Sequence, residues 1–240
     1  MTATIAVALD TGDLDIAAGW AAAAGPHVST VKIGLELYLH HGADAVVRCR
    51  EASGGRAVFL DLKLHDIPNT VAGAARSVAG LAPDYLTVHA SGGTAMIRAA
   101  VDALPGTRVA AVTVLTSLRE EDLAAVGLTG TATDAVRRLC VLAVTAGARA
   151  IVCSPQEVAA VRREVGPDIT LITPGVRPAG AGTGDQSRVA TPEQAAGDGA
   201  DLLVVGRPIT GAPDIAAATR AISATVSVAS PVSSLSAGRS

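Results

Sequence analysis

Short apolar runs rich in β-branched residues recur along the chain and alternate with longer, Ala-rich stretches of helical composition. Continuous apolar runs of this kind are typical of strands that are buried on both faces. Eight strands are predicted, at residues 5–9, 28–33, 57–61, 85–88, 109–114, 150–153, 170–173 and 202–205. Helices are predicted between and after them, at residues 14–24, 34–52, 71–81, 94–103, 133–145, 156–165, 191–196 and 214–222.

This alternation predicts an α/β fold in which a parallel sheet is covered by helices on its outer face. Eight strand–helix units in roughly 220 residues fit a single-domain (β/α)8 TIM barrel, whose usual length is ~250 residues. An open, doubly wound sheet is the alternative, but it requires a Gly-rich phosphate turn after the first strand, where this chain has Asp10-Thr11-Gly12-Asp13. We therefore assign the barrel to residues 1–222 and expect the Ser/Ala-rich tail, 223–240, to be poorly ordered.

The strongest chemical signal is the stretch Asp61-Leu62-Lys63-Leu64-His65-Asp66, which follows an apolar run. Residues two apart in a strand point to the same side, so Asp61 and Lys63 are expected to project together. Asp66 comes three residues later, within reach of the same pocket. Because buried charges are costly, such a cluster favours a functional site, although a structural ion-pair cluster has the same pattern.

A barrel enzyme carries its functional residues at the carboxyl ends of many strands. Polar residues follow the predicted strands in this way: Asp10, Lys32, Asp61, Lys63, His89, Thr116, Arg177 and Arg207. Each alone has a simpler interpretation as a helix cap or a solvated charge, and Asp10 is equally well placed to cap the next helix. Their recurrence around the barrel favours one common site.

The loops after the seventh and eighth strands are where many barrels bind phosphate. Gly206 allows backbone N–H groups to approach an anion, and Arg207 offers a planar set of donors. The Gly-rich segment 178–185 is predicted to be a mobile lid, with Gln186 as an amide donor at its end. A surface arginine in a helix-start turn is the simpler alternative for Arg207.

Composition limits the possible partners. The formal charge is −3, from 19 basic and 22 acidic residues, which gives no basic footprint for nucleic acid or for an anionic membrane. No apolar run approaches the ~18 residues of a membrane span, and the N-terminus lacks the basic region of a signal peptide. Three scattered cysteines suit reduced thiols, so a cytoplasmic protein is expected.

Taken together, these residues resemble the orotidine 5'-phosphate decarboxylase family. The Asp-x-Lys-x-x-Asp element alone is shared with related sugar-phosphate enzymes, whereas its extension through Ile67-Pro68-Asn69-Thr70 is far more specific. The matching segments occur in family order at residues 8–10, 31–37, 59–70, 88–90, 115–117, 173–177, 185–186 with 188–189, and 204–207.

The resemblance implies decarboxylation of orotidine 5'-monophosphate to uridine 5'-monophosphate, a lyase step of pyrimidine biosynthesis that uses no cofactor and no metal. It makes Lys63 the general acid that protonates C6 of the pyrimidine, and it puts Asp61 beside the departing carboxylate. Lys32 joins this charged network and, together with Asp10, contacts the ribose. The sequence fits, because no motif for a cofactor that could accept electrons is visible in it.

The same resemblance implies a homodimer in which Asp66, Ile67 and Thr70 reach into the neighbouring subunit's site. The other substrate contacts that it implies are to the pyrimidine and the phosphate, through Thr116, Arg177, Gln186, Gly206 and Arg207.

Two alternatives stay open. The first is a Mg²⁺-dependent sugar-phosphate enzyme of the same superfamily, with Glu36 as a metal ligand, although Lys32 puts a cation where a metal requires oxygen ligands. The second is a phosphate-binding barrel that regulates without catalysis, which would have no need of Lys63. His65 and His89 are interpreted as hydrogen-bonding residues behind the site rather than as catalysts.

Overall fold

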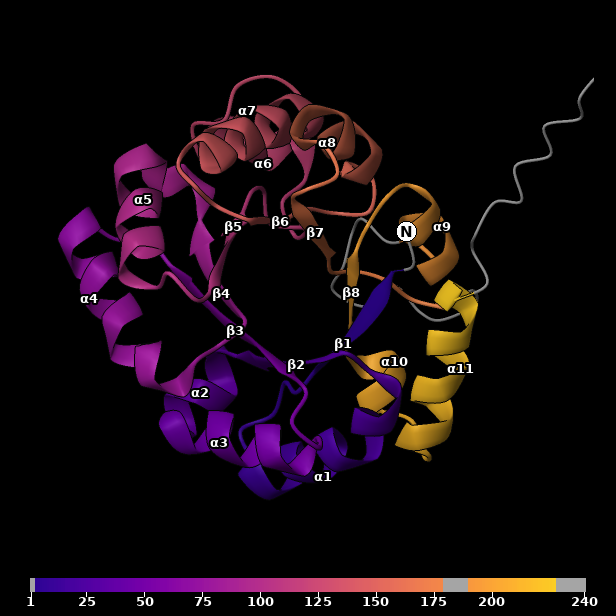
Figure 1. Ribbon diagram of the computed structural model, residues 1–240. Coiled ribbons are helices and arrows are strands. Elements are labelled where there is room, and N and C mark those ends of the chain that lie inside the picture. Colours follow the sequence, from indigo (N-terminus) through magenta and orange to yellow (C-terminus); the bar gives the residue numbers. More distant parts are fainter. Residues whose placement is uncertain (1–2, 179–189, 228–240) are drawn as a thin grey trace, which may run out of the picture.

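Eight parallel strands close into a barrel in which each strand pairs with its neighbours in the sequence and β1 pairs with β8. The computed structural model describes residues 3–178 and 190–227 (Figure 1). The strands are β1 (Thr4–Ala8), β2 (Thr30–Gly34), β3 (Ala57–Leu64), β4 (Tyr85–His89), β5 (Arg108–Val112), β6 (Ala150–Val152), β7 (Thr170–Thr173) and β8 (Leu202–Val205). The predicted (β/α)8 TIM barrel is thus confirmed.

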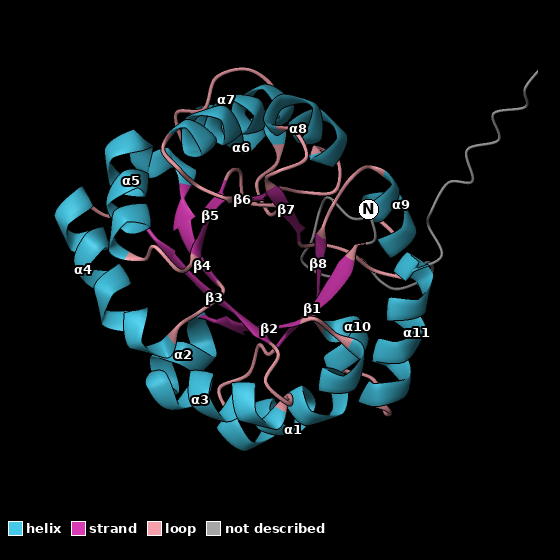
Figure 2. Ribbon diagram, in the orientation of Figure 1, coloured by secondary structure: helices cyan, strands magenta, loops and turns pink. Residues whose placement is uncertain are grey.

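Helices surround the barrel as an outer ring (Figure 2). They are α1 (Leu14–Ala24), α2 (Leu35–His41), α3 (Ala43–Ala52), α4 (Pro68–Val78), α5 (Gly93–Ala103), α6 (Glu120–Ala125), α7 (Ala132–Thr145), α8 (Val158–Val165), α9 (Pro192–Gly197), α10 (Arg207–Thr210) and α11 (Ile215–Ser227). Short 3₁₀ turns follow α1 and α4 and precede α5, at Gly25–His27, Ala79–Leu81 and Ala90–Gly92. The helices bury one face each; α4, for example, buries Val71, Ala75 and Val78.

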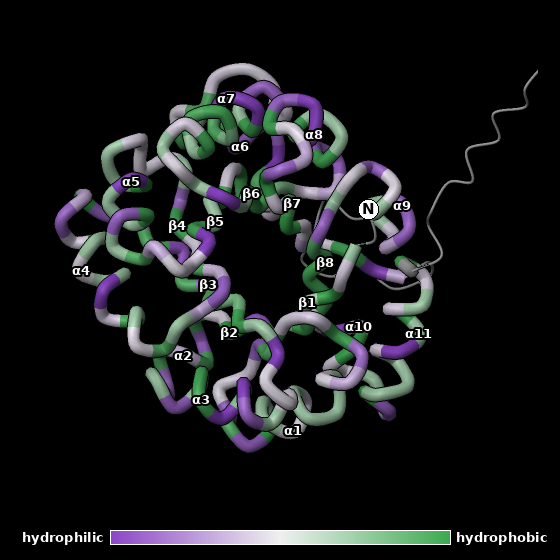
Figure 3. The backbone as a smooth tube through the Cα atoms, viewed as in Figure 1, coloured by the Kyte–Doolittle hydropathy of each residue, from purple (hydrophilic) through white to green (hydrophobic). Residues whose placement is uncertain are grey.

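The apolar core has two parts. The larger lies between the strands and the helices, and the smaller fills the inside of the barrel. Figure 3 shows the strands as largely hydrophobic along the ring. Inside the barrel Phe59 and Tyr85 meet edge to face with ring centroids 5.9 Å apart, and small residues such as Ala110 and Ala150 face them. Large and small side chains together fill the inside of the barrel below its carboxyl end.

Several element boundaries differ from the predictions. The single helix predicted over residues 34–52 is two helices, because Gly42 between α2 and α3 has φ +55°, which no residue inside a helix can adopt. Strand β3 runs to Leu64 rather than ending at residue 61, with a bulge near its end. The short helices α6 and α10 were not predicted, and α11 ends at Ser227, beyond the expected end at residue 222.

Residues 228–240, most of the predicted lid and Gln186 lie outside the described residues. Among the residues that the structure does describe, no helix combines the length and apolar character needed to cross a membrane.

Candidate active site

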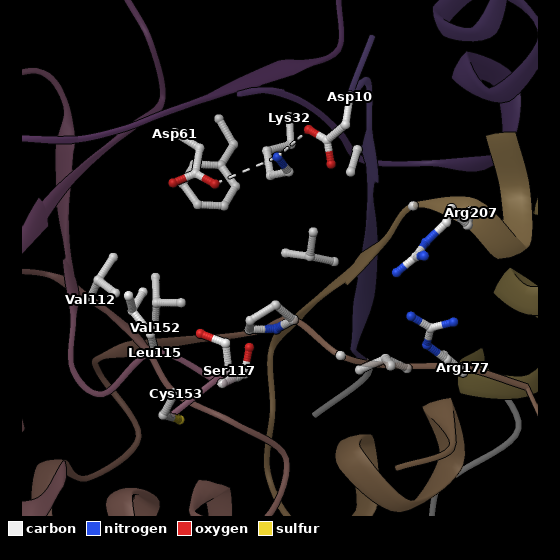
Figure 4. A pocket seen from close by; sticks show the side chains of 18 of the residues that line it. Asp10, Lys32, Asp61, Val112, Leu115, Ser117, Val152, Cys153, Arg177 and Arg207 are labelled. Carbon is white, nitrogen blue, oxygen red and sulfur yellow. Dashed lines mark hydrogen bonds and ion pairs between the residues drawn. The ribbon is translucent and has the colours of Figure 1, made fainter. Parts of the chain in front are cut away.

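A cavity of about 640 Å³ opens at the carboxyl end of the barrel (Figure 4). Its inner wall is apolar and includes Phe59, Val112, Val152 and Val204. Charged side chains stand above this wall on both sides, from the ends of β1, β2 and β3 on one side and from the loops after β7 and β8 on the other. A mostly apolar cavity with a few convergent charged groups is typical of a small-molecule site.

Four side chains on the β1–β3 side form one continuous ion-pair network, here called the charged array: Asp10, Lys32, Asp61 and Lys63. The Lys32 ammonium lies 2.8 Å from Asp10 Oδ1 and 3.5 Å from Asp61 Oδ2. Lys63 Nζ lies 2.9 Å from Asp61 Oδ1. The sequence expectation that Asp61 and Lys63 project together is therefore met, and both line the cavity.

The electrostatics of the array keep its inner members charged. Burial by itself favours a neutral Lys32, but the charges of Asp61 and Asp10 outweigh burial and raise its pKa. Burial likewise favours a protonated Asp61, yet Lys32, Lys63 and the hydroxyl of Thr87 together lower its pKa. Because their opposite charges support one another, Lys32 and Asp61 stay ionised around neutral pH.

Arg177 and Arg207 lie across the cavity from the charged array, with their guanidinium groups pointing toward each other (Figure 4). Burial and the nearby charge of Arg207 lower the pKa of Arg177. Gly206 follows β8 and is the N-cap residue of α10, so backbone and side-chain donors meet at one end of the cavity. Two arginines in this arrangement suit a dianionic group such as a phosphate monoester.

Thr116 lines the cavity from the loop after β5, together with Ser117 and Cys153, which the sequence did not single out as site residues.

The rings of His65 and His89 lie 5.3 Å apart at a tilt of 40°. Burial and the charges of His65 and Lys63 lower the pKa of His89, so this imidazole is neutral at pH 7. Neither histidine is among the residues that line the cavity.

Asp66, Ile67 and Thr70 do not line the cavity of their own chain. All three are exposed on the surface, and Asp66 Oδ1 accepts a hydrogen bond from the N–H of Ile67 at 2.6 Å. The expectation from spacing, that Asp66 returns to the pocket of Asp61, is therefore not met within one chain, because β3 continues to Leu64 and carries Asp66 past the rim.

The geometry also decides two alternatives that the sequence had left open. Asp10 does not cap α1, since Asp13 Oδ1 accepts from the N–H groups of Asp15 and Ile16. Glu36 lies in the first turn of α2 and does not line the cavity. Within the described part of the chain no cluster of three or more His, Cys, Asp or Glu residues is arranged to hold a metal ion.

Thr87 contacts the charged array and is another residue that the sequence reasoning missed. It is fully buried, and its hydroxyl contacts both Asp61 and the backbone of Lys63. One signal was available, because Thr87 is the polar residue inside the apolar stretch Tyr85–Val88 of the strand that follows the charged one. Its contacts depend on strand register, which the sequence pattern does not give.

Comparison with known proteins shows the family to which the chain belongs. A family model described as Orotidine 5'-phosphate decarboxylase / HUMPS family matches residues 3–222. The chain belongs to this family. Membership of the Orotidine 5'-phosphate decarboxylase / HUMPS family therefore covers the whole barrel and confirms the resemblance predicted from the motifs.

Individual members of the family are similar to this chain over nearly its whole length. Orotidine 5'-phosphate decarboxylase of Thermobifida fusca (strain YX) is 70% identical over 224 residues, covering 93% of this chain and 96% of the relative. That of Anaeromyxobacter sp. (strain K) is 59% identical over 221 residues, covering 92% and 96%. The crystal structure of the Lactobacillus acidophilus decarboxylase matches with a TM-score of 0.81 at 35% identity, covering 94% of this chain and 99% of that one. The chain is accordingly an enzyme, a decarboxylase.

Proposed function

We propose that the enzyme converts orotidine 5'-monophosphate to uridine 5'-monophosphate without a cofactor or metal, with Lys63 as the proton donor. The observation that carries this proposal is that one cavity holds the charged array on one side and the Arg177–Arg207 pair on the other. A nucleoside monophosphate fits such a cavity, with its phosphate at the arginines and its base against the array.

The proposed chemistry begins when the bond between C6 and the carboxylate breaks. CO₂ leaves and the electron pair stays on C6 as a poorly delocalised carbanion. Lys63, held by Asp61 at 2.9 Å, presents a fixed positive charge to this carbanion and then transfers a proton from Nζ to C6. The neutral amine is reprotonated by solvent, since the Lys63 side chain is 31% exposed.

Asp61 and Lys32 set the field in which this transfer occurs. We place Asp61 beside the substrate carboxylate, where its negative charge disfavours the bound ground state. Lys32 neutralises the inner oxygen of Asp61 and, together with the exposed Asp10, contacts the ribose. Such fixed charges need no reorganisation during the reaction, and this is the main advantage of a preorganised site.

The phosphate end supplies binding energy away from the reacting carbon. In our proposal Arg207 and Gln186 hold the phosphate, backbone N–H groups near Gly206 approach it, and Arg177 lies on its lid side. Thr116, which lines the same cavity, contacts the pyrimidine. Binding at this remote group can orient the base against Lys63 and so raise kcat as well as affinity.

We further propose that the active enzyme is a homodimer with shared sites. Ile67 is a large apolar residue that is 66% exposed, and Leu39 on α2 is 78% exposed. Large apolar side chains that are this exposed suit a protein interface. Asp66, Ile67 and Thr70 would then complete the neighbouring subunit's site, which fits their exposure and their absence from the lining of their own cavity. The three buried cysteines suit the cytoplasm, where pyrimidine nucleotides are made.

The proposal is tested by following the ultraviolet absorbance of orotidine 5'-monophosphate with and without EDTA. We expect turnover that EDTA leaves unchanged, whereas a requirement for Mg²⁺ would contradict the metal-free chemistry. Lys63→Arg keeps a positive charge but cannot release its proton at accessible pH, so kcat is expected to fall by about 10²–10⁴-fold.

Binding of uridine 5'-monophosphate to Lys63→Arg, measured by calorimetry, is the control for an intact phosphate site. Normal turnover in this variant would remove Lys63 from the role of proton donor. Lost binding in Arg207→Ala, with the array unchanged, is the matched result expected at the phosphate end.

A further inference from the structure

The end of β3 is irregular at the point where it carries the charged array. Leu60 pairs with Leu86 of β4 and Leu64 pairs with Val88, so four steps along β3 are matched by two steps along β4. The residues between these pairs, including Asp61 and Lys63, form a bulge opposite Thr87. A bulge leaves backbone groups without their usual ladder partners.

The side chain of Thr87 replaces the missing ladder partner. Its hydroxyl accepts a hydrogen bond from the backbone N–H of Lys63 at 2.8 Å and donates one to Asp61 Oδ1 at 3.0 Å. Thr87 is fully buried, with 0% of its surface exposed, so water does not compete for these bonds. A single hydroxyl thereby connects the backbone of one array member to the side chain of the other.

The backbone that Thr87 holds is itself unusual. Lys63 has φ +50°, in the left-handed region that lysine rarely adopts. A conformation of this kind persists only where neighbouring groups hold it. Here it places the Lys63 ammonium 2.9 Å from Asp61 Oδ1, the same oxygen that accepts from Thr87. The direction of Lys63 therefore depends on the contact with Thr87.

We propose that Thr87 is a positioning residue that fixes the direction of the Lys63 ammonium over the substrate base. It touches no substrate atom and acts through Asp61 and the Lys63 backbone. This inference rests on the proposed role of Lys63 as proton donor, and it adds the reason why a hydroxyl on β4 is required. Serine retains that hydroxyl, whereas valine has the shape of threonine without it.

The test compares Thr87→Val and Thr87→Ser in steady-state decarboxylation of orotidine 5'-monophosphate. Misplacement of a reacting group by about 1 Å costs roughly 10²-fold in rate, so kcat of Thr87→Val is expected to fall about 100-fold. KM and the affinity for uridine 5'-monophosphate are expected to change little, since the phosphate end is intact. Thr87→Ser is expected to recover most of kcat. Equal kcat values for the Val and Ser variants would overturn the inference.

Thr113→Val is the matched control. Thr113 follows β5, is 5% exposed, and donates its hydroxyl to Val152 O at 2.9 Å without touching the charged array. The same loss of a buried hydroxyl is expected to leave kcat within about two-fold, as for changes away from the chemistry. If Thr113→Val lowered kcat as much as Thr87→Val, general loosening of the barrel would explain the loss and the positioning role would be wrong.

The chain provides a direct readout of the ammonium, because Lys32 and Lys63 are its two lysines. Labelling lysine with ¹³C at Cε gives two side-chain NMR signals, and the spectrum of Lys63→Arg assigns them. In Thr87→Val we expect the Lys63 signal to shift and broaden while that of Lys32 keeps its position. An unchanged Lys63 signal would count against the inference.

The two proposals fail in different ways. An active wild type, an inactive Lys63→Arg and a fully active Thr87→Val would reject the role of Thr87 alone. A wild type that binds uridine 5'-monophosphate but does not consume orotidine 5'-monophosphate would reject the proposed function, while the NMR comparison would still report whether Thr87 fixes Lys63.

Discussion

The two lysines of this chain both belong to the charged array, although the chain has 19 lysine and arginine residues in all. Arginine forms surface ion pairs as well as lysine does, but its pKa is too high for it to give up a proton. Lysine can carry charge in one step and release a proton in the next. This distribution fits proton transfer by a lysine of the charged array and structural or anion-binding roles for the arginines.

The opposite pKa shifts of Asp61 and Lys32 predict how stability depends on pH. The pKa of Asp61 is lowered in the folded state, so its contribution is present above the unfolded value of ~3.9 and is lost as pH falls through the folded value. The pKa of Lys32 is raised, so its contribution is present below ~10.4 and is lost as pH rises through the folded value. We expect a plateau in the free energy of unfolding between these limits.

Urea denaturation at a series of pH values measures this plateau. Asp61→Asn is expected to flatten the acid limb, and Lys32→Met the alkaline limb, because each removes one of the titrating groups. Persistence of the full acid limb in Asp61→Asn would assign that limb to other carboxylates.

The residue positions that depend on strand ends could be predicted from the sequence, and the contacts that depend on strand register could not. Asp10, Lys32, Asp61 and Lys63 each follow an apolar run, and the structure brings all four together. The contact of Thr87 with Lys63 requires the bulge in β3, which no local sequence pattern predicts.

At the scale of elements, the eight strands were predicted from their apolar runs, whereas short helices and a helix break were not predicted. Helix α6 begins in a polar loop, where the Asp122 carboxylate accepts from the N–H of Arg119 at 2.9 Å. The break between α2 and α3 depends on Gly42, whose φ of +55° is invisible in composition. Short polar helices and glycine breaks lack the apolar periodicity on which prediction relies.

Gly42 and Gly19 form a matched pair for testing the break. A Cβ at either position would meet nothing within 4 Å, so packing does not distinguish them. Gly42→Ala is expected to destabilise the fold by about 1–3 kcal/mol, because alanine is strained at positive φ. Gly19→Ala, inside α1, is expected to stabilise it by about 0.5–1 kcal/mol, because alanine favours the helix. Equal effects in thermal or urea unfolding would show that the backbone conformation at Gly42 is not what matters.

At the scale of the whole molecule, the barrel brings residues far apart in sequence to one cavity but leaves part of the charged motif outside it. Asp61 and Lys63 line the chain's own cavity, and Asp66 lies exposed beyond β3. A two-fold symmetric dimer would bring each Asp66 to its neighbour's site, so the motif would serve two sites at once. This arrangement makes subunit mixing a decisive measurement.

Lys63→Ala and Asp66→Ala are each expected to be nearly inactive alone, and activity is expected to return when the two variants are unfolded together and refolded as mixed dimers. In a mixed dimer one site combines the native Lys63 of the second variant with the native Asp66 of the first. Random pairing of equal amounts makes about a quarter of all sites native, so about a quarter of wild-type activity is expected. Mixing Lys63→Ala with Asp61→Ala is the control, because both residues belong to one chain's cavity and no pairing restores a native site. Recovery in the control, or none in the test mixture, would contradict the shared site.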